Sequence, residues 1–69
     1  MASDVATNQK ANLRTGPGME FDNIGWIKAG RYVTILDRDG KWSKCLVHGG
    51  DQDGTVAWIH NDLLKTVGS

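Results

Sequence analysis

Turn-forming residues interrupt this sequence so often that the stretches between them are too short for an ordinary helix. Glycine-containing clusters, several with proline or aspartate, fall at residues 16–18, 29–30, 37–40 and 49–54. The runs between them are rich in β-branched and aromatic side chains, a pattern typical of a small all-β barrel or sandwich. We therefore expect strands at residues 23–28, 32–37, 41–48 and 55–60.

The alternation of side chains along a strand assigns faces to these runs. Val33 and Ile35 are two residues apart and should point into one core. Ile24 and Ile27 are an odd number of residues apart, so a regular strand would place them on opposite faces. This mismatch predicts a kink or bulge at Gly25.

Length and charge exclude several classes of protein. The chain has 69 residues, which favours one domain spanning residues 1–69. Eight basic and eight acidic residues are scattered along it, without the basic stripe of a nucleic-acid binder. No apolar stretch approaches the length of a membrane-spanning helix, and the first ten residues show no secretory signal. The single cysteine excludes an internal disulfide framework.

The segment Gly16-Pro17-Gly18 has the glycine content of a phosphate-binding loop. Such a loop needs free backbone N–H groups that lead into a helix, and Pro17 lacks one. A turn is therefore the better interpretation, with φ preset at Pro17 and flanking glycines that permit positive φ. Before this turn, apolar residues alternate with Asn12 and Arg14, which should stay outside the core.

Several motifs in register resemble the bacterial SH3 (SH3b) family. Residues 12–18, Asn-Leu-Arg-Thr-Gly-Pro-Gly, resemble its Asn-Val-Arg-Ser-Gly-Pro-Ser signature. Residues 40–45 resemble Gly-Gly-Trp-Tyr-Lys-Val, with Cys45 at a core valine position, and residues 54–59 resemble the closing Gly-Trp-Val. The resemblance covers about residues 5–66, leaving tails at 1–4 and 67–69. The chain departs from the family at Ala57, at Trp26 and in its long 47–55 loop.

This resemblance implies an SH3-like barrel of five to six short antiparallel strands, with one 3₁₀ turn near residues 61–64. It also implies a non-catalytic targeting module that binds cell-wall peptidoglycan or its stem peptide, in the periplasm or outside the cell. The alternative is an interaction module that docks on a neighbouring domain or an extended peptide. We expect a monomer, with weak self-association through Trp26 as an open alternative.

The candidate ligand-binding residues are two polar and four aromatic side chains. They are expected around a groove between the 15–23 and 47–55 loops: Asn12, Arg14, Phe21, Trp26, Trp42 and Trp58. For Trp42 a packing role is favoured, whereas Trp58 is open between recognition and shielding of the barrel. Trp26 points outward, either to a ligand or to a covering part of the chain. Arg14 either pairs with Glu20 or Asp22 or offers its guanidinium to a ligand carboxylate.

Metal and catalytic sites are weakly supported. Residues 51–54, Asp-Gln-Asp-Gly, resemble part of a calcium loop, but the first and last ligand positions fall on Gly49 and His60. Cys45 and His48 should point to opposite faces of a strand, which disfavours zinc. A buried Cys45 is the simpler interpretation than a nucleophile. We expect no metal, no cofactor and no catalytic residues.

Overall fold

The computed structural model describes residues 4–66, and within them it is built from short strands and one 3₁₀ turn. All strand pairs are antiparallel, which confirms the expected all-β class. Of the expected tails, residues 1–3 and 67–69 lie outside the described residues, and Asp4 already belongs to the first strand. The elements are β1 (Asp4–Thr7), β2 (Ala11–Arg14), β3 (Asn23–Ile27), β4 (Tyr32–Asp39), β5 (Trp42–Val47), β6 (Val56–His60), η1 (Asn61–Leu63) and β7 (Leu64–Thr66).

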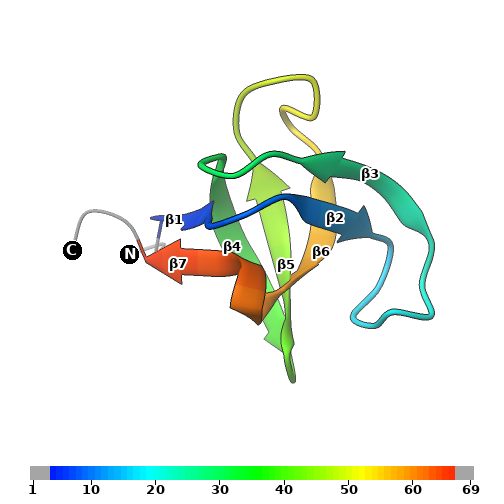
Figure 1. Ribbon diagram of the computed structural model, residues 1–69. Helices are drawn as coiled ribbons and strands as arrows, with labels where there is room; N and C mark the ends of the chain where they lie inside the picture. The colour runs from blue at the N-terminus through cyan, green and yellow to red at the C-terminus, as the bar shows by residue number, and fades with distance from the viewer. Residues whose placement is uncertain (1–3, 67–69) are drawn as a thin grey trace.

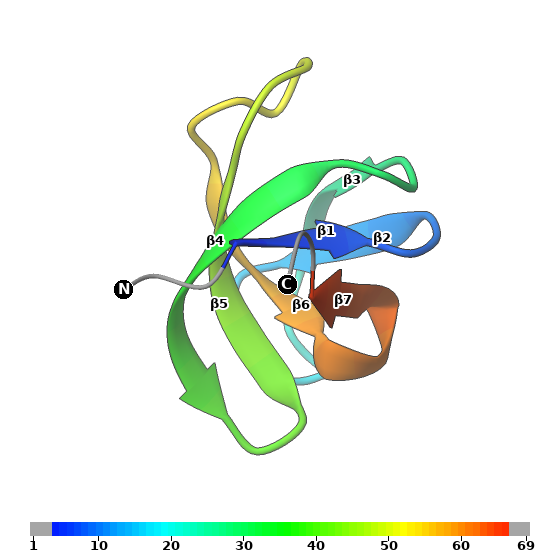
Figure 2. The same ribbon diagram turned by 90° about the vertical axis from the view of Figure 1, so that its left-hand side faces the viewer.

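The strands form one curled sheet in the order β3-β2-β6-β5-β4-β1-β7 (Figures 1 and 2). The described residues thus form seven strands, whereas the sequence analysis expected five to six. The terminal strands, β1 and β7, were not placed by the sequence analysis, and they pair with each other. β7 has three residues, too few for alternation to be read from the sequence, and in β1 the consecutive residues Val5, Ala6 and Thr7 are all buried, so that strand shows no alternation. The 3₁₀ turn is confirmed at η1, directly before β7.

The core contains only small and medium-sized apolar side chains. They come from the inner faces of the strands, as alternation predicts for Val33, Ala57 and Ile59. Ile35 is partly buried and packs against the same cluster. All five aromatic side chains lie outside the buried set of the described residues. The buried apolar residues are Val5, Ala6, Ala11, Leu13, Ile27, Val33, Cys45, Val47, Ala57 and Ile59.

A β-bulge in β3 confirms the predicted irregularity near Gly25. Leu13 pairs with Gly25, but the next residue of β2, Arg14, pairs with Asn23. Ile24 is therefore the additional residue, and it is 49% exposed while Ile27 is buried. The additional residue shifts the alternation of β3 by one position, so Ile27 points into the core and its neighbour Trp26 points outward.

The Gly16-Pro17-Gly18 segment is a turn in the loop between β2 and β3, as expected. The amide of Gly18 donates to the carbonyl of Gly16 at 2.9 Å. The expected reason for the glycines was wrong, because neither Gly16 nor Gly18 has a positive φ. Space explains Gly16 instead, because a Cβ there would lie 2.4 Å from the Phe21 ring, whereas a Cβ on Gly18 would meet only the flexible carboxylate end of Glu20.

Thr7, at the end of β1, ties this strand to the turn between β3 and β4. Its buried hydroxyl donates to the carbonyl of Lys28 at 2.7 Å and accepts from the amide of Arg31 at 3.0 Å. The amide of Thr7 donates to the carbonyl of Arg31 at 3.0 Å, and the carbonyl of Thr7 accepts from the amide of Gly30 at 2.7 Å. Because these bonds satisfy the polar groups of a fully buried residue, they stabilise the turn against the barrel.

Thr7→Val tests this tie. Valine has a similar shape but no hydroxyl, so the carbonyl of Lys28 and the amide of Arg31 each lose a partner. We expect the free energy of unfolding to fall by about 1–3 kcal/mol, measured by urea denaturation. Thr15→Val is the control, because this exposed threonine should change stability by less than about 0.5 kcal/mol. Equal stability of the Thr7→Val chain and the unaltered chain would contradict the assignment.

Candidate functional site

A hollow of about 310 Å³ lies on the outer surface where β2, β5 and η1 meet. The indole of Trp42, at the start of β5, lies in it together with Met19 from the β2–β3 loop and Leu63 from η1. We call this hollow the Trp42 groove. It unites three of the six predicted site residues, and its full lining is Asn12, Arg14, Met19, Trp42, His60, Asp62 and Leu63.

The register of β5 and β6 sets the geometry of this groove. Trp42 pairs with His60, so both side chains project from the same outer face. Their rings meet edge to face, with centroids 5.2 Å apart and planes at 75°. The imidazole Nδ1 accepts the amide of Asp62 at 3.1 Å, which fixes the ring at the start of η1. Trp42 thus both packs against His60 and presents a surface to the groove.

Arg14 holds the β2–β3 loop in place beside the groove. Its Nη1 donates to the carbonyls of Met19 and Phe21 at 3.2 and 3.0 Å. The predicted ion pair with Glu20 or Asp22 is not formed, and within residues 4–66 no lysine or arginine lies within ion-pair distance of a carboxylate; the one histidine–carboxylate contact there joins His60 Nδ1 to Asp62 at 3.8 Å. The backbone carbonyls thus take the place of the expected carboxylates, and the loop backbone is fixed by the arginine rather than by its acidic side chains.

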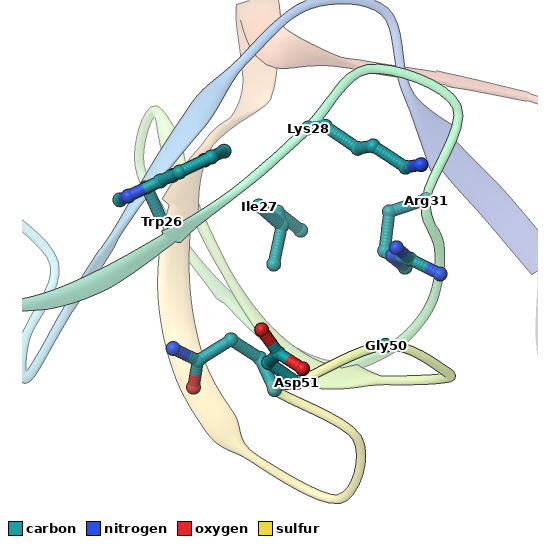
Figure 3. A pocket seen from close by; sticks show the side chains of 7 residues that line it. Trp26, Ile27, Lys28, Arg31, Gly50 and Asp51 are labelled. Carbon is teal, nitrogen blue, oxygen red and sulfur yellow. The ribbon is translucent and has the colours of Figure 1, made fainter.

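Trp26 lies in a different hollow, of about 360 Å³, bounded by β3, the β3–β4 turn and the β5–β6 loop (Figure 3). We call it the Trp26 hollow, and Trp26, Ile27, Lys28, Arg31, Gly50, Asp51 and Gln52 line it. The sequence predicted one groove between the 15–23 and 47–55 loops. Figures 1 and 2 show these loops at separate places on the barrel, and four of the six predicted side chains are divided between two hollows.

The exposed indole of Trp26 has an intramolecular neighbour. The ammonium of Lys10 lies 4.6 Å from the ring centroid, within the range of a cation–π interaction. The side chain nevertheless remains 55% exposed. One lysine therefore contacts the indole without covering it.

Phe21 and Trp58 line neither hollow. The Phe21 ring packs over Gly16 inside the β2–β3 loop. Trp58 is half-buried on the outer face of β6, where it pairs with Arg14 on one side and Lys44 on the other. Both positions fit a packing role, and a ligand contact at either residue stays a prediction.

Sequence reasoning missed several of the residues that line the hollows. Met19, His60 and Leu63 join the Trp42 groove through the β5–β6 register and the path of η1. Lys28 and Arg31 join the Trp26 hollow because the β5–β6 loop approaches the β3–β4 turn. His60 alone had a readable signal, since it belongs to the outward set of β6 with Trp58.

The Asp-Gln-Asp-Gly segment forms a hairpin loop, as the sequence analysis favoured. The carboxylate of Asp53 accepts the amide of Gly49 at 2.7 Å, and Val47 and Gly54 close the loop with a backbone bond of 2.8 Å. In the described part of the chain, no three histidine, cysteine, aspartate or glutamate side chains converge as metal ligands. The aspartate therefore serves the geometry of the loop.

Cys45 is fully buried in the core, which confirms the sequence interpretation. Burial raises the pKa of its thiol to about 11, an effect that Arg38 partly opposes. The thiol also donates to the carbonyl of Ser43 at 3.4 Å. A protonated, inaccessible thiol is poorly suited to act as a nucleophile.

The fold and its two solvent-open hollows define a small antiparallel β-barrel with surface grooves. The family model described as bacterial SH3 domain matches residues 9–65, and the chain belongs to this family. No solved structure matches significantly. None of the helical structure in residues 4–66 has the length and apolarity to cross a membrane.

Curated relatives carry a similar segment within longer chains. A protein of Staphylococcus epidermidis named as a probable cell wall amidase, LytH, is 36% identical over 59 residues, which cover 86% of this chain and 20% of the relative. YrvJ of Bacillus subtilis, named with similar reserve as an N-acetylmuramoyl-L-alanine amidase, is 29% identical over 55 residues. These residues cover 80% of this chain and 11% of YrvJ. An uncharacterized protein of Haemophilus influenzae is 38% identical over 65 residues, covering 94% and 30%. The chain thus spans about a fifth of the length of the LytH relative.

The raised pKa of Cys45 predicts a pH-dependent stability. Above the ordinary thiol pKa of 9.0 the unfolded chain loses this proton, whereas the folded chain keeps it up to about pH 11. The protonated thiol therefore makes its full contribution to the free energy of unfolding below pH 9, and this contribution is lost as the pH rises towards 11. Because one pKa unit corresponds to about 1.4 kcal/mol, the loss is at most about 3 kcal/mol.

Urea unfolding between pH 8 and pH 11 measures this contribution, with Cys45→Ala as the comparison. The variant lacks the thiol, so its stability should fall less steeply over this range, although the small cavity lowers its stability at every pH. Parallel stability curves for the two chains would contradict the pKa assignment.

Proposed function

We propose that the chain is a non-catalytic module that holds a larger protein on the cell wall by binding peptidoglycan or its stem peptide. The Trp42 groove is the observation that carries this proposal. Its lining combines the apolar side chains of Trp42, Met19 and Leu63 with the polar or charged side chains of Asn12, Arg14, His60 and Asp62. An aromatic surface with polar groups beside it suits an extended sugar or peptide, because the flat ring binds with little ordering cost.

The relatives support the same function. Their names place a similar segment in proteins named as cell wall amidases, of which this segment is a minor part. A targeting role for the segment leaves the amidase chemistry to the remainder of such a protein. On this proposal the chain acts as a monomeric single domain, without a cofactor, in the periplasm or outside the cell.

A second candidate function is docking on a neighbouring domain or peptide. It is favoured by exposed apolar side chains away from both hollows, since Tyr32 and Leu36 of β4 and Val56 of β6 are 54%, 51% and 45% exposed. Such a surface is suited to contact another protein. Co-purification of a stoichiometric protein partner, lost in Leu36→Glu, would favour docking over wall binding.

Met19→Glu tests the Trp42 groove without disturbing the core, because Met19 is 72% exposed. The change places a carboxylate among the apolar side chains of the groove, so we expect binding to insoluble peptidoglycan in sedimentation assays to weaken at least about tenfold, or about 1.4 kcal/mol. Trp42→Ala should have a similar or larger effect.

Leu36→Glu is the matched control, since it introduces the same charge at an exposed apolar residue outside the groove. It should leave wall binding unchanged. If the unaltered chain fails to sediment with peptidoglycan, or if Met19→Glu binds as well as Leu36→Glu, the groove is not the wall-binding site.

A further inference from the structure

The Trp26 hollow differs in chemistry from the Trp42 groove. No residue lines both, and the hollow lies beside β3, the strand at one end of the sheet order. Figure 3 shows Trp26 on one side of it and the side chains of Lys28 and Arg31 together on the other. The hollow therefore joins an aromatic wall to a pair of cations.

These cations have no carboxylate partner in the described part of the chain. Neither Lys28 nor Arg31 forms an ion pair there, although Asp51 also lines the hollow. With two cations and one carboxylate, the lining carries a net positive charge, and Lys10 on Trp26 adds another beside it. An anion entering this hollow would meet unneutralised positive charge.

Arg31 is held in position rather than left free at the surface. Its backbone is bonded to Thr7 through both its amide and its carbonyl. Arg31 is half-buried, and its guanidinium lies against the β5–β6 loop, where a Cβ on Gly50 would lie 2.7 Å from Nη2. A guanidinium that is fixed in this way loses little entropy when it binds a carboxylate in a bidentate manner.

We propose that the Trp26 hollow is a second binding site, specific for a carboxylate-bearing ligand. The carboxylate lies between Lys28 and Arg31, and the body of the ligand contacts the indole of Trp26. A volume of about 360 Å³ admits one sugar ring or a short peptide end, so the carboxylate belongs to an acidic sugar or to a peptide terminus. This site is separate from the Trp42 groove and does not depend on wall binding there.

Two pairs of small probes test the proposal, and the members of each pair differ in the carboxylate. N-acetylmuramic acid is compared with N-acetylglucosamine, and N-acetyl-alanyl-alanine with its C-terminal amide. Each is titrated into the ¹⁵N-labelled chain while the indole N–H of Trp26 and the backbone amide of Arg31 are followed by NMR. We expect the acid of at least one pair to shift both signals saturably, with at least fivefold weaker binding of its neutral partner and weaker binding at high salt.

Matched variants locate the binding. Lys28→Met should weaken binding of the acid at least fivefold, and Lys41→Met, a neutral change at another exposed lysine, should not. Gly50→Ala should weaken it by displacing the guanidinium of Arg31. Gly54→Ala is its control, because both glycines have positive φ, +73° and +84°, but a Cβ on Gly54 meets nothing within 4 Å.

The proposal is overturned if neutral and acidic probes bind equally, if neither acid shifts these signals at millimolar concentration, or if Lys28→Met binds as the unaltered chain does. The pair that responds identifies the source of the carboxylate as sugar or peptide. Met19→Glu should leave this binding unchanged, so failure of this site and failure of the Trp42 groove are distinguishable.

Discussion

The small interior of the barrel decides where its large side chains lie. Two-residue alternation sends every second side chain inward, and the positions that become buried accept only aliphatic residues, cysteine, threonine and serine. An indole adds roughly 150–250 Å² of surface to be buried, too much for this interior. Trp26, Trp42 and Trp58 are consequently placed on the outer surface, where an aromatic side chain must pack against its neighbours or bind something else.

The two outward tryptophans that line hollows lie in different electrostatic settings. Trp42 shares its groove with one cation, Arg14, and one carboxylate, Asp62, so the charges of that lining balance. Trp26 contacts Lys10 and shares its hollow with Lys28 and Arg31, and none of these three cations has an ion-pair partner in residues 4–66. Asn12 and Trp26 pair across β2 and β3, so the groove and the hollow adjoin on this hairpin.

Local rules predicted what depends on neighbours in sequence. Alternation predicted the inward face of Val33, the phase mismatch predicted an irregularity at Gly25 that is a bulge at the neighbouring Ile24, and proline chemistry disfavoured a phosphate loop. The parts that depend on distant contacts could not be read in this way. Arg14 donates to backbone carbonyls rather than to carboxylates because the path of the β2–β3 loop brings those carbonyls to it. Arg31 lies beside Gly50 because the β3–β4 turn and the β5–β6 loop come close together. The same long-range packing divided the single predicted groove into two hollows.

The central claim is that the Trp42 groove is the surface that contacts the cell wall. The most direct measurement is NMR mapping of the labelled chain with soluble peptidoglycan fragments. The account predicts that the largest shifts occur at the indole of Trp42 and at Met19, His60 and Leu63, with Tyr32 and Leu36 unaffected. Shifts confined to the outer face of β4, or no shifts at saturating fragment concentration, would contradict it.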